Sequence, residues 1–310
     1  KFAEKYLVKV LGDGLAKTVL SGAKDPGAIA KAIKAMLKSG MKNEAVVKAA
    51  EELCEKDLIR LSKLRKKGLP EDLINSILKN SKNFGNYSDE ALLLIKNSTK
   101  SFDDALRLID DYGDDFINAY KKYGDDAVDA CTKYGKDGGA YLDAIAKAIS
   151  KGSAKTWDEF LIANPGKNIE EASNSYIKLI DEESPWPEGF DTKAHTVNIK
   201  EGDEFQMVLD SAQPTTSPGN FGTFDNIPKV EYVRNKLAIK IGWKEDCSKV
   251  VTYRVKTGME VTVVEGQIGP QIDQMADVYL PGGGSQIQLL IDRSVNKMDY
   301  LEVVSVRMIN

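Results

Sequence analysis

The sequence predicts an α+β protein: an all-α array of short helices over residues 1–185, followed by a compact β-rich domain over residues 186–310. Three observations predict this class. Apolar residues recur at helical spacing (i, i+3 and i+4) throughout the first part. They alternate with polar residues in the second part, as in half-buried strands. Between the two parts, residues 182–189 contain two prolines and a glycine, which cannot continue a helix.

The composition bounds the partners that the chain can have. Its 310 residues, 42% of them hydrophobic, suffice for two domains of ordinary size. Residues 1–185 carry 30 basic and 30 acidic side chains, whereas residues 186–310 carry 13 and 17. The C-terminal part is therefore mildly acidic, and neither part has the excess of basic residues that is typical of proteins that bind duplex nucleic acid.

The residue types argue against metal and membrane sites. Cys54, Cys131 and Cys247 lie far apart, no CxxC occurs, and His195 is the single histidine, which speaks against most zinc-type sites. No apolar run is long enough to span a bilayer. The chain opens on Lys1 inside a helical pattern, from which we expect a fragment of a longer protein.

The N-terminal part is a series of short helices separated by glycine and asparagine. A stripe of alanine, isoleucine and leucine predicts a helix over residues 28–37. Asn43 is predicted to cap a longer helix that runs through residue 66, and Pro70 to occupy the first turn of the next helix. The last helices are expected over residues 157–162 and 170–180.

An 11-residue repeat is marked by Tyr-Gly pairs at residues 112–113, 123–124 and 134–135. A unit this short must stack on its neighbours to bury its apolar face, so we expect a helical array with each Tyr-Gly at a helix end. The glycines are expected in the left-handed conformation. The Asp-Asp pairs at residues 114–115 and 125–126 could hold a metal ion, but N-capping explains them better.

Alternating apolar residues predict seven strands in the C-terminal part. They are residues 196–199, 205–209, 237–241, 250–255, 260–264, 286–291 and 301–306. A short helix is predicted over residues 230–235, before the third strand.

Glycine-rich turns beside polar or aromatic residues are the first candidates for a binding site. They occur at residues 219–224, 266–271 and 280–287. Glycine allows the backbone to bend with positive φ and to approach a ligand closely. Gln267 and Gln271 flank the second of these turns.

Individual side chains have both a functional and a structural interpretation. Arg234 could hold a phosphate through its guanidinium, or could form a structural ion pair. Gln286 follows a triple glycine and could present its amide to a cleft, or could be an ordinary hairpin residue. Phe221, Phe224 and Trp243 could stack on a flat heterocycle or pack in the core.

Histidine-dependent catalysis finds little support. A Ser-His-Asp or Cys-His arrangement needs a histidine in the site, and His195 stands at the start of the β-rich part, where a surface or hinge role is the better interpretation. Neither a GxSxG nor a Walker A motif occurs. The candidate site is therefore one without histidine.

The motifs at residues 253–255, 266–270 and 281–286 resemble C-terminal toxin domains of bacterial polymorphic toxins. The family is that of NAD glycohydrolases related to tuberculosis necrotizing toxin, which have an ADP-ribosyltransferase-like fold. Gln286 matches a functional glutamine that follows a Pro-Gly-Gly-Gly-x stretch in that family. Arg234 is similar to its arginine after a glycine-aromatic stretch. The resemblance covers roughly the last third of the chain.

The resemblance implies a toxin whose substrate is NAD, either a glycohydrolase or an ADP-ribosyltransferase, without a metal or a further cofactor. Arg234 would hold the pyrophosphate, Phe224 would pack on nicotinamide or its ribose, and Gln286 would orient the ribose or the attacking water. The residues implied to line the nucleotide site are Phe221, Thr223, Phe224, Gln267 and Gln271.

The same resemblance implies a secreted bacterial effector used in competition between bacteria. It would act in the cytoplasm of a target cell and would have an immunity protein as its partner. Two alternatives stay open. One is a metal-independent ribonuclease toxin that uses Arg234, Lys236, Thr223 and Tyr253, against which the acidic charge balance counts. The other is a non-catalytic binding module whose glycine turns are only hairpins.

Overall fold

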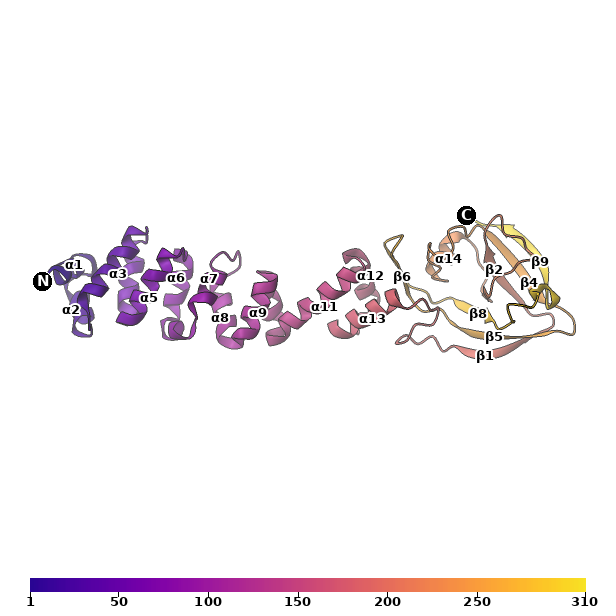
Figure 1. The fold of residues 1–310 in the computed structure, drawn as a ribbon, viewed down its shortest axis with the longest axis horizontal. Helices are drawn as coiled ribbons and strands as arrows, with labels where there is room; N and C mark the ends of the chain where they lie inside the picture. Colours follow the sequence, from indigo (N-terminus) through magenta and orange to yellow (C-terminus); the bar gives the residue numbers. More distant parts are fainter. The chain divides into compact units, whose positions relative to one another are not determined.

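A computed structural model describes residues 1–310, which divide into two compact units, Lys1–Asp143 and Ala144–Asn310 (Figure 1). The first unit is helical, and the second combines helices with antiparallel sheets. The predicted α+β class is therefore confirmed. No helix has the length and apolar character that crossing a membrane would require.

The first unit is an array of short helices that follow one another in sequence order (Figure 1). Its α-helices are α1 (Phe2–Leu11), α2 (Asp13–Ser21), α3 (Pro26–Lys38), α4 (Asn43–Glu52), α5 (Glu55–Lys66), α6 (Glu71–Lys79), α7 (Asp89–Ile95), α8 (Phe102–Tyr112), α9 (Asp114–Tyr123) and α10 (Asp126–Tyr134). Two 3₁₀ turns, η1 (Ser81–Asn86) and η2 (Gly135–Asp137), interrupt them, and α11 (Gly138–Lys151) runs through the division between the units.

Most helices of the array pack against the helix two places along, as in the pairs α1–α3, α3–α5, α4–α6, α6–α8 and α8–α10. Polar contacts follow the same spacing. The Glu55 carboxylate, at the start of α5, accepts hydrogen bonds from the backbone N–H groups of Lys24 (2.6 Å) and Asp25 (3.1 Å), before α3. This stacking gives every amphipathic helix the second surface it needs to bury its apolar face.

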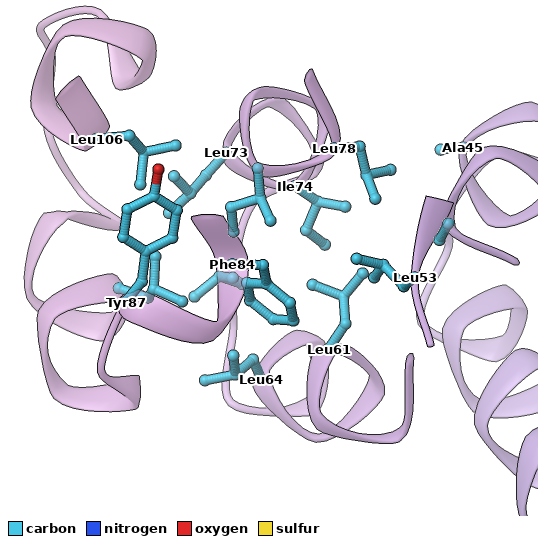
Figure 2. Packing of buried hydrophobic residues seen from close by; sticks show 14 of the residues in the cluster. Ala45, Leu53, Leu61, Leu64, Leu73, Ile74, Leu78, Phe84, Tyr87 and Leu106 are labelled. Carbon is cyan, nitrogen blue, oxygen red and sulfur yellow. The ribbon is translucent and has the colours of Figure 1, made fainter. Parts of the chain in front are cut away.

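A single hydrophobic core runs through the array. Figure 2 shows part of it, where Phe84 and Tyr87, from η1 and the turn after it, lie among the leucines and isoleucines of neighbouring helices. Both rings are buried, and the Tyr87 hydroxyl donates to the Asp110 carboxylate at 2.7 Å. Burial is the larger cause and this hydrogen bond the second of a pKa of Tyr87 that lies above the usual range.

The Tyr-Gly pairs end helices as predicted, because α8, α9 and α10 finish at Tyr112, Tyr123 and Tyr134. The glycines that follow have positive φ, as in Gly124 with φ 56° and ψ −133°. That ψ differs from the left-handed helical value that we expected. It is the mirror image of extended backbone, a region open to glycine and closed to other residues.

Several expectations about the helices differ from the structure, among them the caps: Asn43 is the first residue of α4, and neither Asp114 nor Asp115 caps α9 with its side chain. Residues 43–66 form two helices, because Leu53 is buried in an extended conformation that breaks the run. Pro70 precedes α6 as its N-cap and does not lie in its first turn. Asp125 does not cap α10 with its side chain; it accepts hydrogen bonds from Ser98 and Thr99 on a neighbouring turn instead.

Two helices that the sequence placed with the array belong to the second compact unit. They are α12 (Ala154–Ala163) and α13 (Ile169–Asp181), and they share a core with the hairpin β6 (Gln271–Asp273) and β7 (Val278–Leu280). Trp157, Phe160 and Tyr176 pack there around Ile272. The compact units thus divide after residue 143, whereas the change of apolar period at residue 185 marks only where the strands begin.

The rest of the second unit contains two antiparallel sheets. One has the order β1-β5-β8-β3 and the other β2-β4-β9. Their strands are β1 (His195–Lys200), β2 (Glu204–Leu209), β3 (Phe221–Gly222), β4 (Lys249–Val255), β5 (Glu260–Gln267), β8 (Ser285–Leu289) and β9 (Leu301–Met308). A core that includes Phe205, Tyr253, Val263 and Ile287 joins both sheets. The short helix α14 (Val230–Asn235) forms over the residues predicted for it.

The predicted strand over residues 237–241 is wrong. The segment leaves α14 as a turn, in which the Leu237 N–H bonds to the Tyr232 carbonyl and the Ile239 N–H to the Val233 carbonyl. Ala238 has φ 46°, which no strand allows. The apolar side chains that suggested a strand instead contribute to the core beneath this turn. The three short strands β3, β6 and β7 were not predicted.

Candidate functional site

The second unit contains a cavity of about 390 Å³. Strands β2, β3 and β8 and the turn after α14 supply much of its wall. Its lining includes aromatic side chains, several amides, one lysine and one glutamate: Phe221, Trp243, Gln206, Gln213, Asn220, Gln271, Gln286, Lys244 and Glu183, with apolar residues between them. An apolar wall with a few polar groups is typical of small-molecule sites.

Strand β3 approaches β2 closely at the cavity wall. Gln206 and Thr223 exchange two backbone hydrogen bonds, at 2.8 and 2.9 Å, although their strands belong to different sheets. A Cβ on Gly222 would lie 2.9 Å from the Gln206 carbonyl oxygen and 2.9 Å from the Phe205 ring. Glycine at 222 therefore allows the two sheets to meet beside the cavity.

The backbone N–H groups of the triple-glycine turn all donate to carbonyls of the chain, so they are not free to bind a ligand. Gly282 and Gly284 donate to the Asn235 and Lys236 carbonyls at the end of α14, both at 2.9 Å. Gly283 donates to the Ile268 carbonyl at 2.9 Å. The glycines therefore allow close packing of this turn on α14 and the β5–β6 loop, and that packing sets the start of β8.

Gln286 lies at the second position of β8 and lines the cavity. Its side chain is only 9% exposed, and no group of the chain hydrogen-bonds its amide. Its amide atoms are not among the sealed polar atoms of the chain, so the amide is open to the cavity. An amide in this position can donate to and accept from a bound molecule.

A hydrogen-bond network holds the residue before Gln286. The Asp225 carboxylate accepts from the Ser285 backbone N–H and from the Tyr232 hydroxyl, both at 2.8 Å. The Thr223 and Ser285 hydroxyls lie 3.0 Å apart. Burial raises the pKa of Tyr232 most, and the hydrogen bond to Asp225 adds to it, giving about 12. This hydroxyl therefore keeps its proton and remains a donor.

Arg234 does not line the cavity. Its guanidinium donates to the carbonyl oxygens of Ile239 (2.9 Å) and Glu245 (2.8 Å). These bonds give the side chain a structural role in the turn after α14. The resemblance implied that Arg234 holds the pyrophosphate of the nucleotide that Gln286 contacts, but only Gln286 lines the cavity.

The other predicted site residues divide into two groups. Phe221, Thr223 and Gln271 line the cavity together with Gln286. Phe224 and Gln267 do not. Gln267 lies in a shallow depression of about 420 Å³ that also includes His195, Asp225, Glu265 and Ser285. His195 itself is exposed at the start of β1, as expected for a surface residue.

Two lining residues carry buried oxygens without a hydrogen-bond partner. Gln271 is fully buried, and its Nε2 donates to the Ser184 carbonyl at 2.6 Å while its Oε1 has no partner. The Asn220 Oδ1 is also buried without a partner. Each such group costs free energy unless something hydrogen-bonds to it.

Sequence reasoning missed Lys244, Gln206, Asn220 and Glu183 as lining residues. Lys244 is the cation of the cavity wall, with its Nζ 3.1 Å from the Asp210 carboxylate. Only Asn220 has a local signal, because it lies in the glycine-rich turn 219–224; the other three lie in an ordinary strand or loop and reach the cavity through contacts between distant segments.

The residues named for a ribonuclease do not gather at the cavity. Of that set, Thr223 lines it, whereas Arg234, Lys236 and Tyr253 do not. Tyr253 is buried in the core between the sheets, and its hydroxyl donates to the Thr215 carbonyl at 2.7 Å.

No protein-family model matches the chain, and no curated protein matches it. Among solved structures, the chain is similar to Tne2 in its complex with Tni2, with 26% identity over 40% of this chain and 97% of that chain and a TM-score of 0.32. It is similar to Rhs1-CT, in complex with the cognate immunity protein RhsI1, with 21% identity over 37% of this chain and 81% of that chain and a TM-score of 0.25. It is also similar to Tse6, in complex with Tsi6, with 14% identity over 53% of this chain and 96% of that chain and a TM-score of 0.25. TM-scores of this size do not establish a shared fold.

Proposed function

We propose that the C-terminal unit is the effector domain of a bacterial toxin that acts on NAD and breaks its nicotinamide–ribose bond. One observation carries the proposal: the Gln286 amide, nine-tenths buried and without a protein partner, lines a cavity with aromatic and amide walls. The glutamine follows the Pro-Gly-Gly-Gly-Ser motif on which the family resemblance rests.

The chemistry of the cavity suits a nucleotide. A volume of about 390 Å³ falls in the range of small-molecule pockets. Phe221 and Trp243, each about half-exposed, offer surfaces on which flat rings can stack. Lining amides can bind ribose hydroxyls and a carboxamide, and Lys244 can bind a phosphate.

The reaction places modest demands on the protein. The bond between ribose C1′ and the pyridinium nitrogen breaks, its electron pair leaves with nicotinamide, and C1′ acquires oxocarbenium character. The oxygen of water, or of a target nucleophile, then bonds to C1′ and its proton passes to solvent. Nicotinamide leaves as a neutral molecule and needs no acid, so positioning by groups such as Gln286 supplies the catalysis.

The test measures nicotinamide and ADP-ribose released from NAD by the purified full chain. We expect turnover by the unchanged protein and an approximately 100-fold lower kcat for Gln286→Ala, the typical cost of losing one transition-state hydrogen bond. Gln288→Ala is the matched control, because Gln288 lies on the same strand and does not line the cavity. Intact NAD after incubation with the unchanged protein would refute hydrolysis, and labelled NAD with bacterial lysate then tests transfer to a target.

The resemblance also suggests an immunity protein as partner and a place of action in the cytoplasm of a competing bacterium. We expect expression of residues 144–310 in bacteria to deplete NAD and stop growth, and Gln286→Ala to relieve both effects. An immunity protein would restore growth when co-expressed with the active form. Growth arrest that persists with Gln286→Ala would contradict NAD loss as its cause.

A further inference from the structure

The turn Ile239–Glu245 is held at both ends by one side chain. Arg234 donates to the Ile239 carbonyl at 2.9 Å and to the Glu245 carbonyl at 2.8 Å. Inside the turn, the backbone N–H groups of Trp243 and Lys244 donate to the Lys240 carbonyl, at 3.1 and 3.2 Å. The conformation of this turn, and with it the position of its two lysines, therefore depends on the guanidinium.

Lys244 is the one cationic side chain in the cavity wall. Its Nζ lies 3.1 Å from the Asp210 carboxylate and 3.5 Å from the Gln213 amide oxygen. The Asp210 side chain is half-exposed, and an ion pair so open to water contributes little free energy. The ammonium can therefore contact an anion in the cavity at small cost.

Lys240, the other lysine of this turn, differs from Lys244 because it is buried and has no partner in the chain. Its side chain is only 8% exposed and makes no hydrogen bond or ion pair within the chain. Its Nζ lies 4.8 Å from the centroid of the Trp243 ring, which lines the cavity. The Nζ is not one of the sealed, unpartnered polar atoms of the chain, so the ammonium itself is open to solvent beside this ring. Burial lowers the pKa of the Lys240 ammonium, while the charges of Glu183 and Asp273 act in the opposite direction.

The nearby carboxylates do not provide that acceptor. Both Asp273 oxygens are engaged by backbone N–H groups, Oδ2 by Ile241 at 2.7 Å and Oδ1 by Met275 and Ala276 at 3.1 Å. Glu183 is exposed at the cavity wall and makes no ion pair with Lys240. The Lys240 ammonium thus has no acceptor in the chain and is open to water or to an anion beside the Trp243 ring.

We infer that the Ile239–Glu245 turn is the phosphate-binding element of the cavity, with Lys244 in the cavity wall and Lys240 beside the Trp243 ring as its cations, and Arg234 as the residue that positions it. The inference rests on the proposed function and assigns the pyrophosphate of the substrate to these lysines. Arg234 touches no substrate; it fixes the turn through the two carbonyls. This assignment explains why an arginine that resembles a phosphate ligand in sequence lies outside the cavity.

The experiment measures binding of inorganic pyrophosphate and of ADP to the full chain by calorimetry. We expect Lys244→Gln and Lys240→Met each to weaken binding at least tenfold, as the loss of a charged hydrogen bond predicts. Lys236→Gln is the matched control, because this neighbouring lysine is exposed and belongs neither to the cavity wall nor to the Ile239–Glu245 turn. Lys244→Arg should restore binding, and Lys244 is exposed enough to be replaced without unfolding the chain.

The positioning role of Arg234 has its own readout. Arg234→Lys, which can satisfy at most part of the two-carbonyl contact, should weaken pyrophosphate binding and raise the KM for NAD more than it lowers kcat. Gln286→Ala should lower kcat and leave pyrophosphate binding unchanged. An Arg234→Lys variant with unchanged pyrophosphate affinity would overturn the positioning role.

The outcomes separate this inference from the proposed function. Pyrophosphate binding that is lost in Lys244→Gln, by a protein that leaves NAD intact, would uphold the phosphate-binding turn and refute NAD chemistry. Cleavage of NAD with unchanged KM in both lysine variants would uphold NAD chemistry and refute the phosphate-binding turn. If the unchanged protein binds neither pyrophosphate nor ADP, the phosphate-binding turn is refuted.

Discussion

The Asp225 carboxylate accepts a hydrogen bond from the Ser285 backbone N–H at 2.8 Å, one residue before Gln286. The two residues are 60 positions apart in the chain. The same carboxylate accepts from the Tyr232 hydroxyl, so it connects α14 with the start of β8. A residue outside the cavity wall thereby holds the strand that presents the candidate catalytic amide.

Replacement of Asp225 tests this connection. Asp225→Ala removes the acceptor of two hydrogen bonds and should lower the free energy of unfolding by about 2 kcal/mol, the range for bonds to a charged group. Turnover of NAD should fall with it, because Gln286 loses its support. Asp225→Asn keeps an acceptor oxygen and should retain most of both. Chemical denaturation and NAD turnover measure the two effects; equal losses in both variants would show that the negative charge, not the acceptor, matters.

The glycine ends of the array predict a conformational penalty. Gly124 has φ 56° and ψ −133°, and a Cβ there would meet nothing within 4 Å. Gly124→Ala should therefore lower the free energy of unfolding by about 2 kcal/mol through backbone strain alone. Gly14→Ala is the control, because Gly14 lies in α2 with equally open space and without positive φ. Thermal unfolding compares them, and similar melting temperatures for the two variants would contradict the strain.

The array should lose stability in acid through Asp125. Burial alone would raise the pKa of this carboxyl, but hydrogen bonds from Ser98 and Thr99 outweigh it and lower the pKa to about 2. Because the ordinary value is about 3.9, the stabilisation is present above pH ~4 and is lost as the pH falls towards 2. We expect about 1 kcal/mol, since Asp125 is only partly buried.

Denaturation of Asp125→Asn between pH 5 and 2 checks this contribution. The variant should start less stable than the unchanged protein at neutral pH and should lose less stability as the pH falls. Asp126→Asn serves as the control, because Asp126 is exposed and its side chain makes no hydrogen bond. Parallel pH profiles for Asp125→Asn and the unchanged protein would exclude the proposed titration.

The division after residue 143 predicts which C-terminal fragment is stable. Residues 144–310 keep α12 and α13 on the β6–β7 hairpin, where Glu159 accepts from the Tyr279 N–H at 2.8 Å. Residues 186–310 lack both helices and expose Ile272, now 1% exposed, at a cost of about 2 kcal/mol for that side chain alone. Urea denaturation should show the shorter fragment to be less stable; equal stability would place the boundary at residue 185 instead.

Features that one segment carries within itself could be predicted from the sequence. The helical and alternating apolar periods indicated the α+β class, six of the seven predicted strands formed, and each Tyr-Gly pair ended a helix. Gln286 could be singled out because it follows a triple-glycine turn and because the stretch before it matches a motif of the resembled family. These features depend on backbone conformation and on spacing over a few residues, which the local sequence specifies.

Only the tertiary structure decided which side chains share the cavity. Phe221 and Phe224 are indistinguishable by type and spacing, yet only Phe221 lines it. Arg234 bonds to two carbonyls of a turn that had been predicted as a strand, and Lys244 takes its place at the wall. The reason is physical: apolar periodicity tells which face of an element is buried, but the neighbours of that face are set by packing between segments far apart in the chain.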